Sequence, residues 1–204
     1  MSSDIHFSIL LRSLYEPSAA FEELAQLESG VSTVFFRFSL WLVILPPIFS
    51  LIGAANFGWR IGAEEPLVLA GQSLLLVSLG YFLVLVFGLF STAFISSWMA
   101  STYGADRAIG KNLALITVVG APLAIASVAH LFPDVLLNML VLIPAMIWSM
   151  YLLYKGIPVV LDTPPERGML MASSLVGWLL VAAVSLLGLS MGLWTAGVGP
   201  LLGV

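Results

Sequence analysis

The chain has 204 residues, of which 60% are hydrophobic and only 9% are charged, and its formal net charge is −4. A soluble domain has about 25% charged residues, so this composition excludes an ordinary soluble enzyme and a disordered chain, and it indicates an integral membrane protein. The negative net charge offers no basic surface for nucleic acid, and the absence of cysteine excludes disulfides and cysteine-ligated metals.

Residues 1–30 are predicted to form a short amphipathic helical segment at the membrane interface. Apolar residues with the spacing of one helix face begin it: Phe7, Leu10, Leu11 and Leu14. A second short helix is expected over residues 18–29, ending at Gly30, with Phe21 on its apolar side and Glu22 on its acidic side. Because an acidic face suits anionic lipid poorly, this segment is free to bind a protein partner.

Uncharged stretches then predict a transmembrane domain over residues 31–192. A hydrocarbon core of about 30 Å needs about 20 apolar residues per helix. The spans are expected at residues 31–55, 67–99, 112–132, 135–154 and 169–191, before a short apolar tail at 193–204. The second stretch has room for two crossings, but residues 74–94 contain no Pro, Asn or Asp for a turn, so one long helix is expected. The predicted fold class is an all-α membrane protein with five transmembrane helices.

Prolines and one loop supply the predicted helix ends. We expect five prolines to kink or end helices: Pro46, Pro47, Pro122, Pro144 and Pro158. In the fourth connection, Gly156 and Pro158 are expected to end the fourth span. Thr163-Pro-Pro-Glu166 then has the spacing of a capping box that starts the last helix.

The basic residues predict the orientation, because short cytoplasmic loops are enriched in Lys and Arg. With five spans, one side receives Arg12, Arg37, Arg107, Lys111, Lys155 and Arg167, whereas the other side receives Arg60 alone. The N-terminus is therefore expected in the cytoplasm and the C-terminus outside.

Few polar residues lie within the predicted spans. Arg37 either extends its guanidinium to the headgroups or pairs with Glu28. Gln72, His130, Asp134 and Asn138 are expected at similar depth near the outer face. They form either a shallow polar vestibule for a solute or helix caps and interhelical hydrogen bonds.

Catalytic, cofactor-binding and metal-binding residues are predicted to be absent. The only two histidines, His6 and His130, are too far apart in this topology to share one metal, and no nucleophile or phosphate-loop motif occurs. Gly188 and Gly192 form a GxxxG pair that packs helices either within the bundle or in a homo-oligomer.

Several strings of residues resemble a known family. They are Tyr151-Leu-Leu-Tyr-Lys-Gly-Ile-Pro158 with Thr163-Pro-Pro-Glu-Arg167, Tyr103-Gly-Ala-Asp-Arg107, Ala121-Pro122 and Leu14-Tyr-Glu-Pro17. The chain resembles the bacterial branch of the Yip (Ypt-interacting protein) family of multi-pass membrane proteins. The resemblance implies five spans with a cytoplasmic N-terminus, in a bacterial inner membrane. Eukaryotic members bind Rab-type GTPases in membrane traffic, a role that does not transfer to bacteria, which lack that system.

The function predicted from these features is that of a non-catalytic scaffold or adapter whose cytoplasmic segments bind a protein partner. The alternative is a small-solute transporter or channel. The candidate partner-facing residues are Tyr15, Pro17, Asp106, Arg107, Lys155, Gly156, Pro158, Asp162, Glu166 and Arg167. The candidate intramembrane polar residues are Arg37, Gln72, His130 and Asn138.

Overall fold

The computed structural model describes residues 7–60, 65–66 and 68–195, apart from the side chains of residues 7 and 194. His6, the predicted start of the second span at residue 67 and residues 196–204 of the predicted tail lie outside this description. The helices are α1 (Phe7–Tyr15), α2 (Pro17–Ala25), α3 (Val31–Val34), the π-helix η1 (Phe35–Ser39), α4 (Leu40–Phe57), α5 (Gly71–Tyr103), α6 (Ile109–Ala126), the 3₁₀-helix η2 (Ser127–Leu131), α7 (Val135–Val160) and α8 (Pro165–Thr195).

Five helices are long and apolar enough to cross a membrane, which confirms the predicted fold class. They extend over Val31–Phe57, Gly71–Tyr103, Ile109–Leu131, Val135–Val160 and Pro165–Leu193. The second is a single unbroken helix of 33 residues, as predicted, and is about 50 Å long at 1.5 Å per residue. It ends at Gly104, whose φ of 69° reverses the chain in the left-handed conformation that glycine favours.

The prolines do not end helices, contrary to that part of the prediction. Pro46 and Pro47 lie inside α4, Pro122 lies inside α6, and Pro144 and Pro158 lie inside α7. A proline removes one backbone hydrogen bond, but ending the helix within hydrocarbon would leave several backbone groups without partners. The helices therefore continue through these positions.

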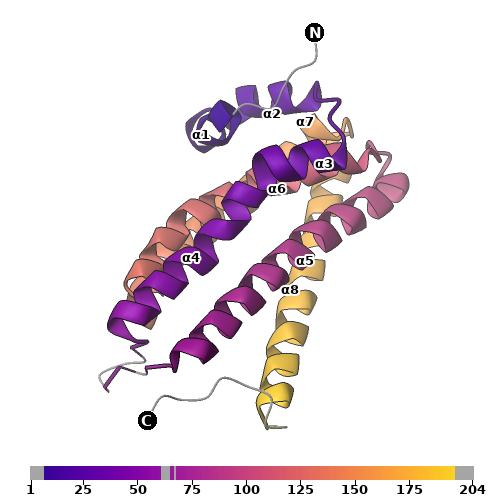
Figure 1. Cartoon of the computed structure of the whole chain (residues 1–204). Coiled ribbons are helices and arrows are strands. Elements are labelled where there is room, and N and C mark those ends of the chain that lie inside the picture. The colour runs from indigo at the N-terminus through magenta and orange to yellow at the C-terminus, as the bar shows by residue number, and fades with distance from the viewer. Residues whose placement is uncertain (1–6, 61–64, 67, 196–204) are drawn as a thin grey trace.

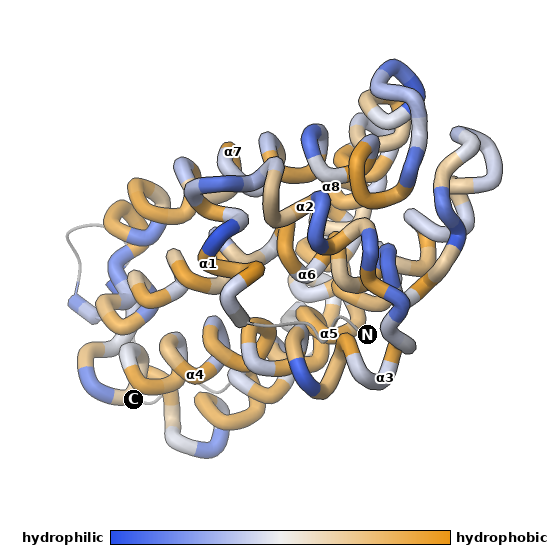
Figure 2. Tube along the Cα trace, turned by 90° about the horizontal axis from the view of Figure 1, so that it is seen from above, coloured by the Kyte–Doolittle hydropathy of each residue, from blue (hydrophilic) through white to orange (hydrophobic). Residues whose placement is uncertain are grey.

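The long helices pack most tightly at one end, where α1 and α2 lie across them (Figure 1). There α6 contacts α1, α2 and α3 as well as α5 and α7, and it is the most buried of the five spans. Figure 2, which looks onto this end, shows hydrophilic segments in α1, α2 and the connections, while the long helices are mainly hydrophobic. We call this the platform end.

The two N-terminal helices differ from the prediction in detail. In α1 the buried apolar residues are Ile9 and Leu10, whereas Leu11 is 56% exposed, so the predicted stripe is only partly buried. Contact with α2 and α6 selects the buried face of this short helix. The second helix begins at Pro17 and ends at Ala25, well before Gly30. Its apolar side is buried as predicted, with Phe21 and Leu24 at 0% exposure.

At the opposite end, two connections are joined by backbone hydrogen bonds. The Arg60 N–H donates to the Pro133 carbonyl oxygen at 2.9 Å, and the Val135 N–H donates to the Arg60 carbonyl oxygen at 3.2 Å. These bonds hold the segment after α4 against the start of α7 and make Arg60 and Asp134 direct neighbours.

Candidate functional site

The connections α5–α6 (residues 104–108) and α7–α8 (residues 161–164) are bonded to one another at the platform end. The Asp106 N–H donates to the Leu161 carbonyl oxygen at 2.7 Å. The buried Thr163 hydroxyl donates to the Tyr103 carbonyl oxygen at 2.9 Å. With α1 and α2, these two connections form one surface, which we call the loop platform.

Thr163 thus has a different role from the predicted one. Its side chain bonds to Tyr103, 60 residues away, instead of starting α8 as a capping-box residue. Gly156 and Pro158 also differ from the prediction, because α7 continues through both to Val160. Ile157 and Val160 are fully buried there, and their packing keeps this turn helical despite the proline.

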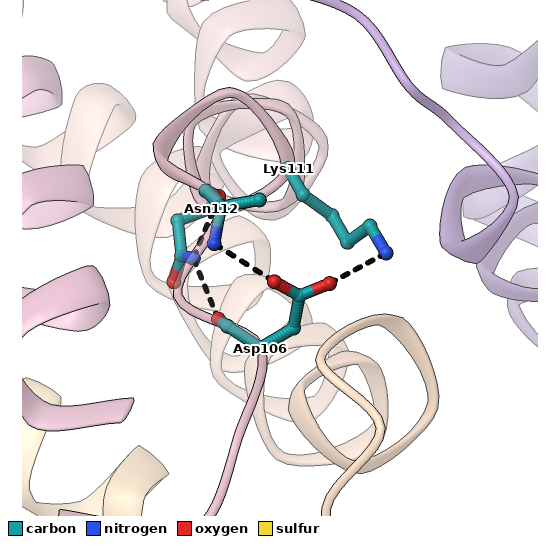
Figure 3. A network of polar contacts seen from close by, with 4 residues as sticks. Asp106, Lys111 and Asn112 are labelled. Carbon is teal, nitrogen blue, oxygen red and sulfur yellow. Dashed lines mark hydrogen bonds and ion pairs between the residues drawn. The ribbon is translucent and has the colours of Figure 1, made fainter. Parts of the chain in front are cut away.

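Asp106 is the centre of the hydrogen bonds within the α5–α6 connection (Figure 3). Its carboxylate accepts from the Lys111 ammonium at 2.7 Å and from the Ala108 backbone N–H at 2.8 Å. The Asn112 side-chain amide donates to the Asp106 carbonyl oxygen at 3.1 Å and to the Ala108 carbonyl oxygen at 3.0 Å. These bonds fix the start of α6, where a carboxylate also interacts favourably with the helix dipole.

We expect the stability contributed by Asp106 to be lost in acid. The hydrogen bond from Lys111, together with that from Ala108, lowers the pKa of Asp106 below its ordinary value of 3.8. A lowered folded-state pKa stabilises the protein above the unfolded-state value, and that stability disappears as pH falls through the folded-state pKa. In thermal unfolding between about pH 7 and pH 3, Asp106→Asn should be less stable at neutral pH and show a smaller loss on acidification. If the variant loses as much stability on acidification as the wild type, Asp106 is not the source of the acid sensitivity.

Asn112 links the connection to the neighbouring helix. Its side chain is fully buried, and its Oδ1 accepts from the Ser96 hydroxyl of α5 at 2.6 Å. The hydroxyl of Ser97, also on α5, donates to the Arg107 carbonyl oxygen at 2.7 Å. The side chain of Asn112 therefore links α6 to α5 and to the α5–α6 connection.

Two tyrosines brace the helices beneath the platform. The Tyr103 hydroxyl lies 2.9 Å from the Ser174 hydroxyl, which connects α5 to α8. The Tyr154 hydroxyl lies 2.9 Å from the Ser173 hydroxyl, which connects α7 to α8. Both contacts hold the third turn of α8 against its neighbouring helices.

Close approach of the N-terminal segment depends on two glycines. A Cβ at Gly156 would lie 2.7 Å from Leu115 Cδ1 and 2.9 Å from the Phe21 ring, so Phe21 occupies the space that glycine leaves free. A Cβ at Gly110 would overlap the Ser29 carbonyl oxygen. The absence of a side chain at each position lets the N-terminal segment rest directly on α6 and α7.

The candidate partner-facing residues fall into three groups. The exposed ones are Tyr15, Arg107, Asp162, Glu166 and Arg167. The half-buried ones are Pro17, Asp106, Lys155 and Pro158. Gly156 is buried beneath Phe21 and offers no surface to a partner, a correction to its predicted role. Lys155 donates to the Tyr151 hydroxyl at 3.1 Å, so its charge is oriented along the surface of α7.

The candidate intramembrane polar residues are not all brought together. Arg37 is exposed on η1 at the platform half of the first span, and Gln72 is exposed on the first turn of α5. His130, Asp134 and Asn138 meet at the opposite end. The Asn138 amide donates to the carbonyl oxygens of Phe132 and Asp134, at 3.0 and 2.8 Å.

These contacts determine the direction of the hydrogen bond between His130 and Asn138. Both Asn138 N–H groups are used, so its Oδ1 faces His130 Nδ1, which must be the donor. The Asp134 carboxylate caps α7 by accepting from the Leu137 N–H at 2.9 Å. These contacts match the helix-capping and interhelical interpretation that the sequence allowed. Within the described residues, no group of three His, Cys, Asp or Glu could hold a metal ion.

Sequence reasoning missed the residues that join the platform. Asn112 marked the boundary of an uncharged stretch, and Ser96 and Tyr103 received no role. An isolated Asn at the start of an apolar helix is the one available signal, because a buried amide requires partners. Its partners on α5 are not readable from spacing along the chain.

Comparisons with known proteins agree with this architecture. The Yip1 domain family profile matches residues 11–197. The chain is 28% identical over 158 residues to inner membrane protein YohC of Escherichia coli strain K12, an alignment that covers 78% of this chain and 81% of that protein. The protein of the same name from Escherichia coli O6:H1 matches to the same extent. No solved structure matches. All the candidate partner-facing residues lie within the matched family range.

Proposed function

We propose that this chain, which belongs to the Yip1 domain family, is a non-catalytic membrane adapter that binds a protein partner through its loop platform. The relatives named above are inner membrane proteins, and we extend that location to this chain. The excess of basic residues at the platform end supports a cytoplasmic platform and N-terminus.

The observation that carries the proposal is that hydrogen bonds and packing join the parts of the platform, and that charged side chains are exposed on it. The two connections are joined by the Asp106–Leu161 and Thr163–Tyr103 hydrogen bonds, and α2 is fixed over α7 by Phe21. A surface that is already ordered loses little conformational entropy when a partner binds. Asp162, Glu166 and Arg167 are exposed on it and are available for charged contacts.

The test is a triple substitution, Asp162→Asn, Glu166→Gln and Arg167→Gln, in the full chain. Asn tolerates the left-handed backbone of Asp162, whose φ is 49°, so the fold should persist. We expect recovery of copurifying partners from mild detergent to fall about fivefold, because charged contacts set specificity and association rate. Quantitative mass spectrometry of the purified complexes measures it.

A matched control neutralises exposed charges at the opposite end, with Arg60→Gln and Glu65→Gln. This control should leave the partner set unchanged. An unaltered partner set in a folded triple variant would contradict the platform as the binding surface.

Small-solute transport is the second candidate, and the buried His130–Asn138 pair is the observation in its favour. A solute pathway would have to connect that pair with the polar network at Asn112. The two lie 18 residues apart along α6 and η2, or about 27 Å. Solute flux into proteoliposomes that is abolished by Arg37→Ala would favour transport over the adapter.

A further inference from the structure

Two opposite charges are held side by side at the end of the bundle opposite the platform. The backbone pairing of Arg60 with Pro133 and Val135 places Arg60 next to Asp134. Both residues line a hollow of about 260 Å³, whose other walls include Phe57 and Phe132. The two phenylalanine rings are stacked, with centroids 6.0 Å apart.

These charges do not neutralise each other. Asp134 Oδ1 accepts from the Leu137 N–H, which leaves Oδ2 able to accept from another donor. Among the residues that the structure describes, neither an ion pair nor a hydrogen bond engages the Arg60 guanidinium. The hollow therefore presents one cation and one anion whose backbone positions are held next to each other.

A groove of about 290 Å³ begins beside this hollow and follows α7. Its walls along α7 include Val135, Asn138, Leu142 and Met146, which recur at helical spacing and share one face. These positions extend over about 16 Å, roughly one leaflet of a hydrocarbon core of about 30 Å.

The groove presents an almost wholly apolar surface. His130 and Asn138, only 8% and 7% exposed, lie at its beginning beside Trp59, but they bond to each other and add little polar surface. Beyond them the walls are apolar side chains, including Met139 and Ile143. A charged hollow is therefore followed by an apolar groove, which is the order of the headgroup and the acyl chains in a membrane phospholipid.

We propose that this hollow and groove together bind a zwitterionic phospholipid with a primary ammonium headgroup, a phosphatidylethanolamine, from the leaflet that this end reaches. The lipid phosphate lies against Arg60, and the ammonium donates to Asp134 Oδ2. One acyl chain lies along α7 as far as Met146. Charge complementarity selects this lipid, because phosphatidylglycerol has no cation for Asp134 and the quaternary ammonium of phosphatidylcholine has no N–H donor.

The test measures lipid binding to the full chain in detergent by native mass spectrometry, with dioleoyl phosphatidylethanolamine, phosphatidylcholine and phosphatidylglycerol. Wild type should bind the ethanolamine lipid about tenfold more tightly than either of the others. Asp134→Asn should abolish the preference over phosphatidylcholine, while Asn preserves the helix cap. Arg60→Gln should weaken binding of all three lipids about fivefold, because each contains a phosphate.

A matched pair of variants tests the groove. Met139→Trp fills it and should weaken binding of all three lipids, whereas Leu140→Trp, at a 65% exposed neighbouring position outside the groove, should have no effect. Equal binding of the ethanolamine and choline lipids by the wild type would overturn the proposed headgroup site. Equal effects of the two tryptophan variants would overturn the proposed acyl-chain site.

Discussion

Phe21→Ala is expected to detach α2 from the bundle and to destabilise the folded protein by about 3 kcal/mol, in the range for removal of a buried aromatic side chain. Phe21 is fully buried and its ring occupies the space above Gly156. Loss of this contact should raise hydrogen exchange throughout α1 and α2, because Phe21 is the largest of the fully buried side chains in this segment. Hydrogen exchange read by mass spectrometry, together with thermal unfolding in detergent, measures both effects.

The neighbouring substitution Glu22→Ala is the control, because Glu22 is exposed on the same helix. It should change stability by less than about 0.5 kcal/mol. If Phe21→Ala behaves like this control, α2 is not held by the aromatic contact.

The reciprocal substitution tests the same contact from the other side. Gly156→Ala places a Cβ within 2.9 Å of the Phe21 ring and 2.7 Å of Leu115 Cδ1, so the ring must move. The destabilisation caused by Gly156→Ala should be smaller in a Phe21→Ala background, because one of the two collisions is gone. If the destabilisations of the two substitutions simply add, the added Cβ collides with Leu115 and not with Phe21.

Asn112→Leu is expected to destabilise the protein by about 2 kcal/mol through loss of buried hydrogen bonds. The substitution leaves the Ser96 hydroxyl without its acceptor and the Asp106 carbonyl oxygen without the amide donor. The Ala108 carbonyl oxygen keeps a partner, because it also accepts from the Asn112 backbone N–H at 3.0 Å. Chemical unfolding monitored by tryptophan fluorescence gives the change in free energy.

Asn56→Leu provides the matched control for this prediction. Asn56 is an exposed amide whose Nδ2 donates to the Ile52 carbonyl oxygen of its own helix and to no other group in the described part of the chain. Its substitution should alter stability by less than about 0.5 kcal/mol. A double-mutant cycle with Ser96→Ala then isolates the link between α5 and α6, and an absence of coupling would show that this bond does not hold the helices together.

The membrane class and the five helices were predictable because they depend on local composition. Each crossing needs a sustained apolar stretch, and the chain has 9% charged residues to interrupt it. The unbroken α5 followed from the lack of turn residues between positions 74 and 94. The proline-based helix ends were wrong, since burial of Ile157 and Val160 keeps α7 helical past Pro158.

The composition and spacing of the sequence thus determined which segments enter the membrane and that they are helical, because a helix satisfies its backbone bonds within each segment. Only the tertiary structure decided which side chains meet. Thr163 bonds to Tyr103, Phe21 covers Gly156, and Arg60 lies beside Asp134, although each pair is far apart in the chain. Such contacts arise from the packing of separate helices and their connections, and no local periodicity encodes them.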